Sequence, residues 1–423
     1  MGKQTLKVLV SGIIAISILF PQQRLISQVI PHSERLVSVA DEPTIKKVVE
    51  SVLQRIEAEY VDSKFIRSND WQAVRNRYLS RPYQSMEEAY AAIRAILIAL
   101  RDPNTQFLDP QEFQDWAWGP SVDRVGIGLN IVINKDTRQL TVFVADNTPA
   151  QKAGICSKDI LLKVDGQPTL GMELTKVQDL LLGKPGTAVV VTVQRGQQKV
   201  DIRVERAAIT ANPVRWNIQN SSRGKIGYIR LARFDINAIG QMRKAIILME
   251  QQAVVGYILD LRGNSGGLYL AGLGITRLWL NDRLIVTLSD RANNAKREQS
   301  WQRALTQKPL VILVDEGSAA GSEILASALQ ENKRAKLVGS RTAGKNTIQS
   351  IKALPDGSGL ALTVGKWITS KGLDISGKGL TPDVSASLTE KECNSTGTNG
   401  DLQYTKALEL LNQLVQQSNT SRS

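Results

Sequence analysis

The sequence has almost no histidine and very little cysteine. Its 423 residues include one histidine, His32, and two cysteines, Cys156 and Cys393. A single histidine near the N-terminus excludes Ser–His–Asp and Cys–His catalytic sites and histidine-based zinc sites. If the chain is a hydrolase, its general base must be lysine, aspartate or glutamate, and we expect no metal and no cofactor. The cysteines are far apart and form no CxxC motif, so we expect two free thiols in preference to one disulfide.

The sequence also lacks basic clusters and a long apolar run. The formal net charge is +13, but lysine and arginine are scattered, so we expect no nucleic-acid binding. The apolar stretch at residues 8–20 follows Lys3 and Lys7 and is shorter than the ~20 residues of a membrane span. It predicts export, with residues 1–40 serving as a cleaved signal peptide or as an uncleaved anchor that associates with the membrane.

Apolar periodicity divides the rest of the chain into regions with different secondary structure. A helical spacing predicts three helices within residues 41–121, at 44–61, 70–79 and 85–100, the last opened by a capping-box spacing from Ser85 to Glu88. We assign no chemistry to these helices. Residues 122–208 change to short strands around one helix, with a tight turn at Asp165–Gly166.

From residue 209 to 389 strand patterns alternate with helical ones, which predicts parallel βα units. Residues 359–369 are interpreted as an edge strand pair. A polar linker at 390–400 and a C-terminal helix within 401–423 complete a multidomain α/β protein.

A glycine-containing loop opens the β-rich region. Such a loop before an edge strand leaves backbone N–H groups free to hold a peptide carboxylate while the peptide adds as a further strand. The set Val125, Gly126, Ile127, Gly128 and Leu129, with the turn and strand motifs that follow it, resembles a PDZ domain. The alternative is a purely structural module.

Three further segments each lie at a strand-to-helix or strand-to-loop junction. Residues 259–267 end in Gly266 and Gly267, which leave room for backbone N–H groups aimed at an oxyanion. Residues 317–325 open a helix, where a nucleophile would be exposed. Residues 342–350 contain Lys345, which could act as a general base if a closed site desolvated it. Alone, each segment is more often an ordinary junction.

Taken in order, these motifs resemble those of the carboxyl-terminal processing peptidases, the tail-specific, PDZ-containing serine peptidases with a Ser–Lys dyad. The resemblance rests on the following motifs: DPNTQFLDP at 102–110, the PDZ-like module, ANPVRW at 211–216, GKIGYIRL at 224–231, DLRxNxGG at 260–267, SEILAxALQ at 322–330, GKxxxQ at 344–349 and GLxPD at 379–383. It implies a crotonase-like α/β core, C-terminal tails of exported proteins as partners, and the periplasm or the thylakoid lumen as location. It also assigns the general base to Lys345 and the group that orients it to Gln349. In an active peptidase, the oxyanion N–H groups would be those of Gly266, Gly267 and Gly321.

The chain departs from this family at the nucleophile. The family's serine stands three residues before the helix glutamate, Glu323, and that position is Ala320, which has no nucleophilic atom. Ser322 matches a second, non-catalytic serine of the family, and Ser318 lies two residues upstream of the nucleophile position. Either serine would need a different turn, because near-attack geometry tolerates errors of only about 1 Å. Ala343, where the family commonly has phenylalanine, is a further departure.

Four interpretations follow. The chain is an active peptidase with an off-register serine, or a pseudopeptidase that binds tails and regulates or escorts an active relative. An alanine introduced to trap substrate is a third interpretation, which the presence of the leader disfavours. An acyl-CoA enzyme of the crotonase type is the fourth, and the inserted PDZ-like module argues against it.

Overall fold

The computed structural model describes residues 42–117, 125–134, 137–144, 148–209, 212–292, 294–386 and 401–420. The predicted leader (residues 1–40, including the apolar stretch 8–20) and the predicted linker (390–400) fall outside these ranges. Within them, no helix has the length and apolar character needed to cross a membrane.

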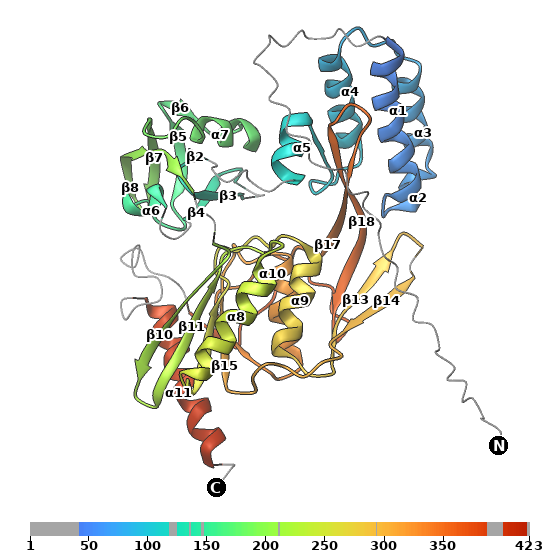
Figure 1. The fold of residues 1–423 in the computed structure, drawn as a ribbon. Helices are drawn as coiled ribbons and strands as arrows, with labels where there is room; N and C mark the ends of the chain where they lie inside the picture. The colour runs from blue at the N-terminus through green and yellow to red at the C-terminus, as the bar shows by residue number, and fades with distance from the viewer. Residues whose placement is uncertain are drawn as a thin grey trace, which may run out of the picture. The chain divides into compact units, whose positions relative to one another are not determined.

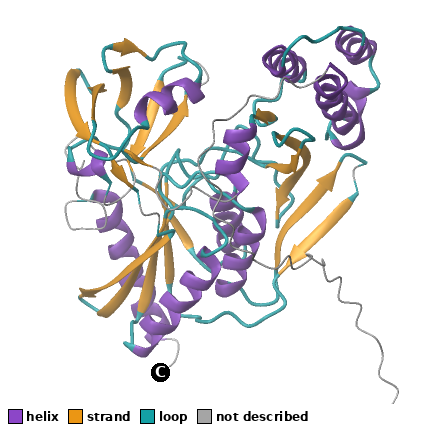
Figure 2. Cartoon of the chain, turned by 45° about the horizontal axis from the view of Figure 1, so that its top comes forward, coloured by secondary structure: helices purple, strands orange, loops and turns teal. Residues whose placement is uncertain are grey.

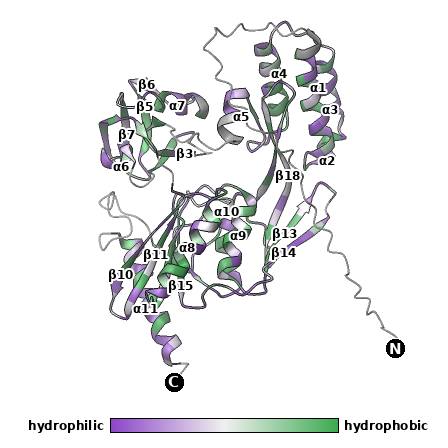
Figure 3. Ribbon diagram, viewed as in Figure 1, coloured by the Kyte–Doolittle hydropathy of each residue, from purple (hydrophilic) through white to green (hydrophobic). Residues whose placement is uncertain are grey.

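The first region is helical because its apolar residues recur at helical spacing and because side chains cap the N-termini of several of its helices. It contains α1 (Glu42–Glu59), α2 (Ser63–Ile66), α3 (Asn69–Leu79) and α4 (Met86–Ala99) (Figure 1). Green and purple segments alternate along α1 in Figure 3, as expected of an amphipathic helix. Ser85 Oγ accepts the Glu88 N–H at 3.3 Å, and the Glu88 carboxylate accepts the Gln84 N–H at 3.1 Å. The three predicted helices are therefore confirmed.

The β-rich module (residues 125–209) has its own core and its own sheet. Its elements are β2 (Val125–Gly126), β3 (Leu129–Ile133), β4 (Leu140–Val144), α6 (Pro149–Lys152), β5 (Ile160–Val164), β6 (Gln167–Pro168), α7 (Leu174–Leu181), β7 (Ala188–Arg195), β8 (Gln198–Glu205) and β9 (Ala207–Ala208). The sheet order is β3-β4-β5-β7-β8, with β6 beside β5 and β2 paired to β9, so β3 is an edge strand. Asp165 and Gly166 both have positive φ in the predicted turn between β5 and β6.

A mixed six-stranded sheet forms the centre of the following region. Its strands are β10 (Val214–Ser221), β11 (Gly224–Leu231), β12 (Gly256–Asp260), β15 (Leu310–Val314), β16 (Lys336–Gly339) and β19 (Val384–Ser385). They lie in the order β10-β11-β12-β15-β16-β19, and only β10 is antiparallel to its neighbour. The predicted parallel βα units are confirmed.

Helices cover both faces of this sheet (Figure 2). They are α8 (Ala238–Gln251), α9 (Tyr269–Trp279), α10 (Gly321–Glu331) and α11 (Leu402–Thr420). Side chains of α8, α9 and α10 pack on one face with Leu259 and Ile312, and side chains of α11 pack on the other with Ile258 and Val311. The period-two alternation of strands accounts for this division. The predicted C-terminal helix is confirmed.

A second sheet shows that one prediction was wrong. It contains β1 (Gln106–Leu108), β13 (Leu284–Asp290), β14 (Ala295–Gln299), β17 (Thr347–Ala353) and β18 (Gly359–Thr369), and α5 (Pro110–Ala117) follows β1. The expected edge pair at 359–369 is instead the central strand β18, which pairs with β1, β13 and β17. Leu354, Leu360 and Leu362, at the far end of the β17–β18 hairpin, belong to the core of the helical region. Because β18 has paired strands on both of its sides, it cannot lie at an edge.

The cysteine prediction also needs correction. Cys156 is disulfide-bonded, whereas the spacing of the two cysteines favoured free thiols. The sequence contains one other cysteine, Cys393, which lies outside the described residues. Spacing along the chain is a poor guide here, because a disulfide depends on the distance between the two residues in the fold.

Candidate active site

The three segments that carry the motifs follow adjacent parallel strands. We call them the glycine turn (residues 262–267, after β12), the Ala320 turn (residues 317–321, after β15) and the lysine turn (residues 342–346, after β16). Because β12, β15 and β16 are neighbours and parallel, their carboxyl ends meet at one edge of the sheet, where sites on such sheets are usually built. The sequence order of the motifs therefore becomes proximity in space.

The Ala320 turn has a strained backbone. Ala320 has φ 48° and ψ −107°, a combination that a residue with a Cβ rarely adopts. Gly321 follows as the first residue of α10, so the turn leads directly into a helix N-terminus. The methyl group of Ala320 is partly exposed. The chain therefore keeps the sharp strand-to-helix turn expected at a nucleophile position while lacking the nucleophile.

One buried carboxylate, that of Glu323, connects the Ala320 turn to the lysine turn. Its Oε2 accepts the N–H groups of Ala320 at 3.0 Å and Lys345 at 2.8 Å. Its Oε1 accepts the Gly344 N–H at 2.7 Å and the Thr342 hydroxyl at 2.5 Å. Burial raises the pKa of Glu323, while these four donors act in the opposite direction. Two segments about 20 residues apart in sequence are thus aligned on a single side chain.

The glycine turn packs directly against the Ala320 turn. A Cβ on Gly266 would lie 2.9 Å from the Ala320 Cβ and 2.9 Å from the Gly321 nitrogen. Gly267 has φ 142°, and a Cβ there would lie 2.2 Å from the Phe234 oxygen. Both positions therefore require glycine.

The predicted oxyanion donors differ in their hydrogen bonding. The Gly266 N–H donates to Asn264 Oδ1 at 2.9 Å, and the Asn264 amide donates to the Leu231 oxygen at 2.7 Å. The Gly266 amide is therefore already used inside the turn. Gly267 and Gly321 are the predicted donors that remain, and Gly321 lies at the N-terminus of α10, where backbone N–H groups favour negative charge.

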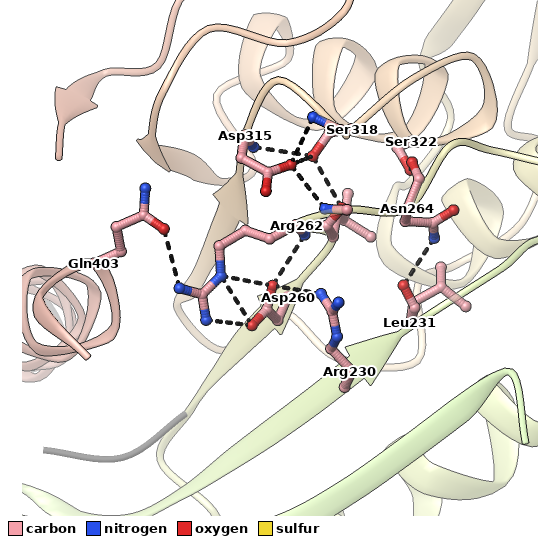
Figure 4. A network of polar contacts seen from close by, with 12 residues as sticks. Arg230, Leu231, Asp260, Arg262, Asn264, Asp315, Ser318, Ser322 and Gln403 are labelled. Atoms are coloured by element: carbon pink, nitrogen blue, oxygen red, sulfur yellow. Dashed lines mark hydrogen bonds and ion pairs between the residues drawn. The ribbon is translucent and has the colours of Figure 1, made fainter. Parts of the chain in front are cut away.

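The two serines near Ala320 are fully buried. Figure 4 shows Ser318 beside Asp315 and Ser322 beside Asn264. Ser318 Oγ lies 2.9 Å from the Leu261 oxygen and accepts the Asp315 N–H at 3.0 Å. Ser322 Oγ donates to the Asn264 oxygen at 2.8 Å. Both hydroxyls therefore hold the Ala320 turn against the end of β12.

The residues expected to supply the base are Lys345 and Gln349. Lys345 is exposed, so this structure does not show the closed site that its role as base requires, and that role stays a prediction. The cause of this exposure is the backbone, since the lysine turn is held by its N–H groups while the side chain extends outward. Gln349 lies on β17 and donates to Thr347 Oγ1 at 2.8 Å. Among the described residues, no hydrogen bond joins Lys345 and Gln349.

The predicted peptide-binding loop lies beside the free edge of the module's sheet. Val125 and Gly126 pair with β9, Ile127 is buried, and Leu129 begins the edge strand β3. Gly128 has φ 85°, and a Cβ there would lie 2.3 Å from the side chain of Thr148. No other residue fits without moving the loop.

The module also contacts the glycine turn and Glu316, the residue just before the Ala320 turn. The Asn130 amide on β3 donates to the Gly263 oxygen at 3.3 Å. Lys158 forms an ion pair with Glu316 at 3.1 Å. A Cβ on Gly263 would lie 3.3 Å from the Phe143 side chain. The strand that would receive a peptide is therefore in hydrogen-bond contact with the glycine turn.

Several residues of this site were not identified from the sequence. They are Asp260, Arg262 and Asp315 behind the turns, and Glu323 and Thr342 between them. Asp315 is buried, and its Oδ1 accepts the N–H groups of Gly263 at 2.7 Å and Gly317 at 3.0 Å; burial raises its pKa. A charged residue within a strand pattern, as in ILDLR and VILVD, was the available signal. In the described part of the chain, no cluster of three or more His, Cys, Asp or Glu side chains could hold a metal.

Comparison with known proteins identifies two parts of the chain. Residues 225–386 match the model of peptidase family S41, and residues 144–195 match that of the PDZ domain. The first range holds all three turns, and the second holds most of the β-rich module.

Similar proteins span most of the chain. A carboxyl-terminal-processing protease of Picosynechococcus sp. is 37% identical over 385 residues, which cover 90% of this chain and 92% of that protein. The chloroplastic carboxyl-terminal-processing peptidase 2 of Arabidopsis thaliana is 33% identical, covering 85% and 73%. Among solved structures, a photosystem II D1 C-terminal processing protease aligns with a TM-score of 0.72 and 30% identity over 84% of this chain and 98% of that one. This chain belongs to the carboxyl-terminal-processing peptidases of peptidase family S41.

Proposed function

We propose that this protein binds the C-terminal tails of exported polypeptides through its PDZ domain. It does not cleave these tails, because its nucleophile position is Ala320. The observation that carries the proposal is the Ala320 turn, which keeps the strained backbone but offers only a methyl group at the nucleophile position. The family resemblance supplies the substrate class. The protein would then act as a pseudopeptidase that regulates or escorts an active relative.

The buried serines support the absence of cleavage. A replacement nucleophile needs an exposed hydroxyl next to a base, and both Ser318 and Ser322 are buried and hydrogen-bonded to backbone carbonyls. To reach a substrate, either hydroxyl would have to leave a buried hydrogen bond, whose loss costs about 1–3 kcal/mol. Lys345 and Gln349 remain as the proposed base and its orienting group, with Gly267 and Gly321 as proposed oxyanion donors.

The free edge of β3 supports tail binding. A peptide that adds beside β3 extends the sheet, and its carboxylate would meet the loop formed by residues 125–129. Leu129, Ile131 and Ile133 are half-buried along that strand and pack against the module's core. They offer apolar contacts to alternate side chains of such a peptide.

We also propose the domain boundaries and the location that the sequence indicates. The boundaries are 41–121, 122–208, 209–389 and 401–423, with linker 390–400. The leader would direct the protein to the periplasm or the thylakoid lumen. Chloroplastic and cyanobacterial relatives agree with either compartment.

A paired assay tests this function. The protein and its Ala320→Ser variant are incubated with an unstructured peptide that ends in an apolar residue. We expect the unmodified protein to bind the peptide without cutting it and the variant to cut it, with Lys345→Ala in the variant abolishing cleavage. The same peptide with an amidated C-terminus is the binding control and should lose affinity. Cleavage by the unmodified protein that disappears in Ser318→Ala or Ser322→Ala would overturn the proposal.

A further inference from the structure

The side chain that opens the glycine turn is a buried cation held from two sides. The Arg262 guanidinium donates to both oxygens of Asp260, the last residue of β12. The distances are 2.5 Å from Nη2 and 3.0 Å from Nε. On its other side it donates to Asp401 at 2.7 and 3.0 Å and to Gln403 Oε1 at 3.0 Å. Figure 4 shows Gln403 reaching Arg262 from the C-terminal helix. Residues 139 and 141 positions away in sequence thus complete this site.

These groups belong to one buried network of paired charges. Arg230 donates to Asp260 Oδ1 at 2.9 Å, so two arginines meet two aspartates, Asp260 and Asp401, and their formal charges cancel. All four residues are buried. Burying a charge is tolerated only when it is paired and hydrogen-bonded. The C-terminal segment therefore supplies a buried anion, Asp401, that pairs with Arg262.

The polar contacts of the C-terminal segment are separate from its apolar docking. Helix α11 is held on the sheet by a buried apolar face that includes Ala407, Leu411 and Val415. Asp401 lies just before the helix and accepts the Tyr404 N–H at 3.0 Å through the same Oδ1 that receives Arg262. Asp401 therefore couples the start of α11 to the position of the guanidinium.

The backbone of Arg262 begins the glycine turn, and two buried aspartates hold it. The Arg262 N–H donates to Asp260 Oδ1 at 3.0 Å, and the Gly263 N–H donates to Asp315. The turn then places Gly266 against Ala320 and Gly321 with no space for a Cβ. A shift of Arg262 would therefore carry the Gly266–Gly267 peptide away from the Ala320 turn.

We propose that Asp401 and Gln403 are positioning residues that hold the glycine turn in place through Arg262. The C-terminal segment, which lies beyond the residues that match peptidase family S41, is then a working part of the site and not only a cover for the sheet. This inference rests on the proposed role of the glycine turn, but its first test requires no turnover.

The first test is hydrogen–deuterium exchange of the full chain. Gln403→Leu removes one neutral acceptor from Arg262, and we expect exchange in residues 262–268 to rise by about tenfold as the turn opens more often. Leu411→Ala is the matched control, because it weakens the apolar docking of the same helix without touching Arg262. It should raise exchange in α11 and leave residues 262–268 unchanged. Equal effects of the two variants on residues 262–268, or no effect of Gln403→Leu, would overturn the proposal.

Two further measurements separate positioning from general stability. Gln403→Glu retains an acceptor for Arg262 but adds a buried negative charge and loses the donor to the Ala386 oxygen, so it should protect residues 262–268 better than Gln403→Leu does even if the fold is less stable. In the Ala320→Ser protein, Gln403→Leu should lower kcat by about tenfold with KM unchanged, as for a group that acts only on the transition state. If Ala320→Ser cuts nothing, the proposed site fails, and the exchange measurement still decides whether the C-terminal segment positions the turn.

Discussion

Two buried carboxylates flank the candidate site and are stabilised in opposite ways. Asp260 ends β12 behind the glycine turn and meets two guanidinium groups. Glu323 lies in the first turn of α10 and meets only backbone N–H groups and one hydroxyl. Burial would raise the pKa of Asp260, but Arg262 and Arg230 hold it well below its usual range. Burial raises the pKa of Glu323, and its hydrogen bonds only partly oppose this.

This difference in partners indicates that Asp260 and Glu323 have different structural roles. Asp260 neutralises buried arginines, so its charge is what the fold requires. Glu323 gathers N–H groups from two turns, so its two acceptor oxygens are what the fold requires. The first carboxylate fixes the strand end to the C-terminal segment, and the second fixes the Ala320 turn to the lysine turn. Substitution by the matching amide separates charge from acceptor capacity and tests this division.

The largest effect should come from Asp260→Asn. The amide removes the anion that pairs with both Arg230 and Arg262, and breaking a buried ion pair costs about 3–5 kcal/mol. Urea denaturation of the variant and the parent measures the loss in free energy of unfolding. Glu59→Gln is the control, because its ion pair with Lys352 is partly exposed and should be worth about 1 kcal/mol or less. Similar losses in the two variants would mean that Asp260 does not act through buried charge.

Glu323→Gln should have an intermediate effect. Its amide nitrogen cannot accept the hydrogen bonds that Glu323 Oε2 receives from Ala320 and Lys345. Leaving buried donors unpaired costs about 1–3 kcal/mol, and the same urea titration measures it. The control is Glu331→Gln at the other end of α10, where the carboxylate accepts the Ser370 hydroxyl and the Lys371 N–H in a half-exposed position. A smaller loss for Glu323→Gln than for Glu331→Gln would contradict the role of Glu323 in joining the Ala320 turn to the lysine turn.

The convergence of the turns could be predicted from the sequence, because it depends on local patterns. Apolar runs predicted β12, β15 and β16 as parallel strands, and parallel neighbours bring their following loops to one edge. The helices of the first region and the edge strand of the PDZ domain were predicted for the same reason. Their periodicity and caps are properties of short segments.

The supporting contacts could not be predicted, because they join distant segments. Arg262 was visible as part of a motif, but its partner Asp401 lies 139 residues later beyond a polar segment. Strand β18 lies between β13 and β17, and these neighbours are only partly buried, so its central position has no clear signal in the sequence. The exposure of Lys345 follows from how its turn is anchored by the backbone, which a motif does not show.

The smallest expected effect is a change with pH in the losses of unfolding free energy caused by Asp260→Asn and Glu323→Gln. This pH dependence distinguishes the two carboxylates most directly. Asp260 has a lowered pKa in the folded state, so its contribution is present above the unfolded pKa of roughly 4 and is lost as the pH falls. Glu323 has a raised pKa in the folded state, so its contribution is complete below its unfolded pKa and is lost as the pH rises through the folded value.

The loss caused by Asp260→Asn should therefore grow as the pH rises from about 2 to about 5, and the loss caused by Glu323→Gln should shrink above about 4. Urea titrations of both variants and the parent at several pH values measure the two trends. Burial also raises the pKa of Asp315, but this group is present in every chain and cancels in the differences. A loss for Glu323→Gln that grew with pH would contradict its raised pKa and would place it with Asp260 as a residue that acts through charge.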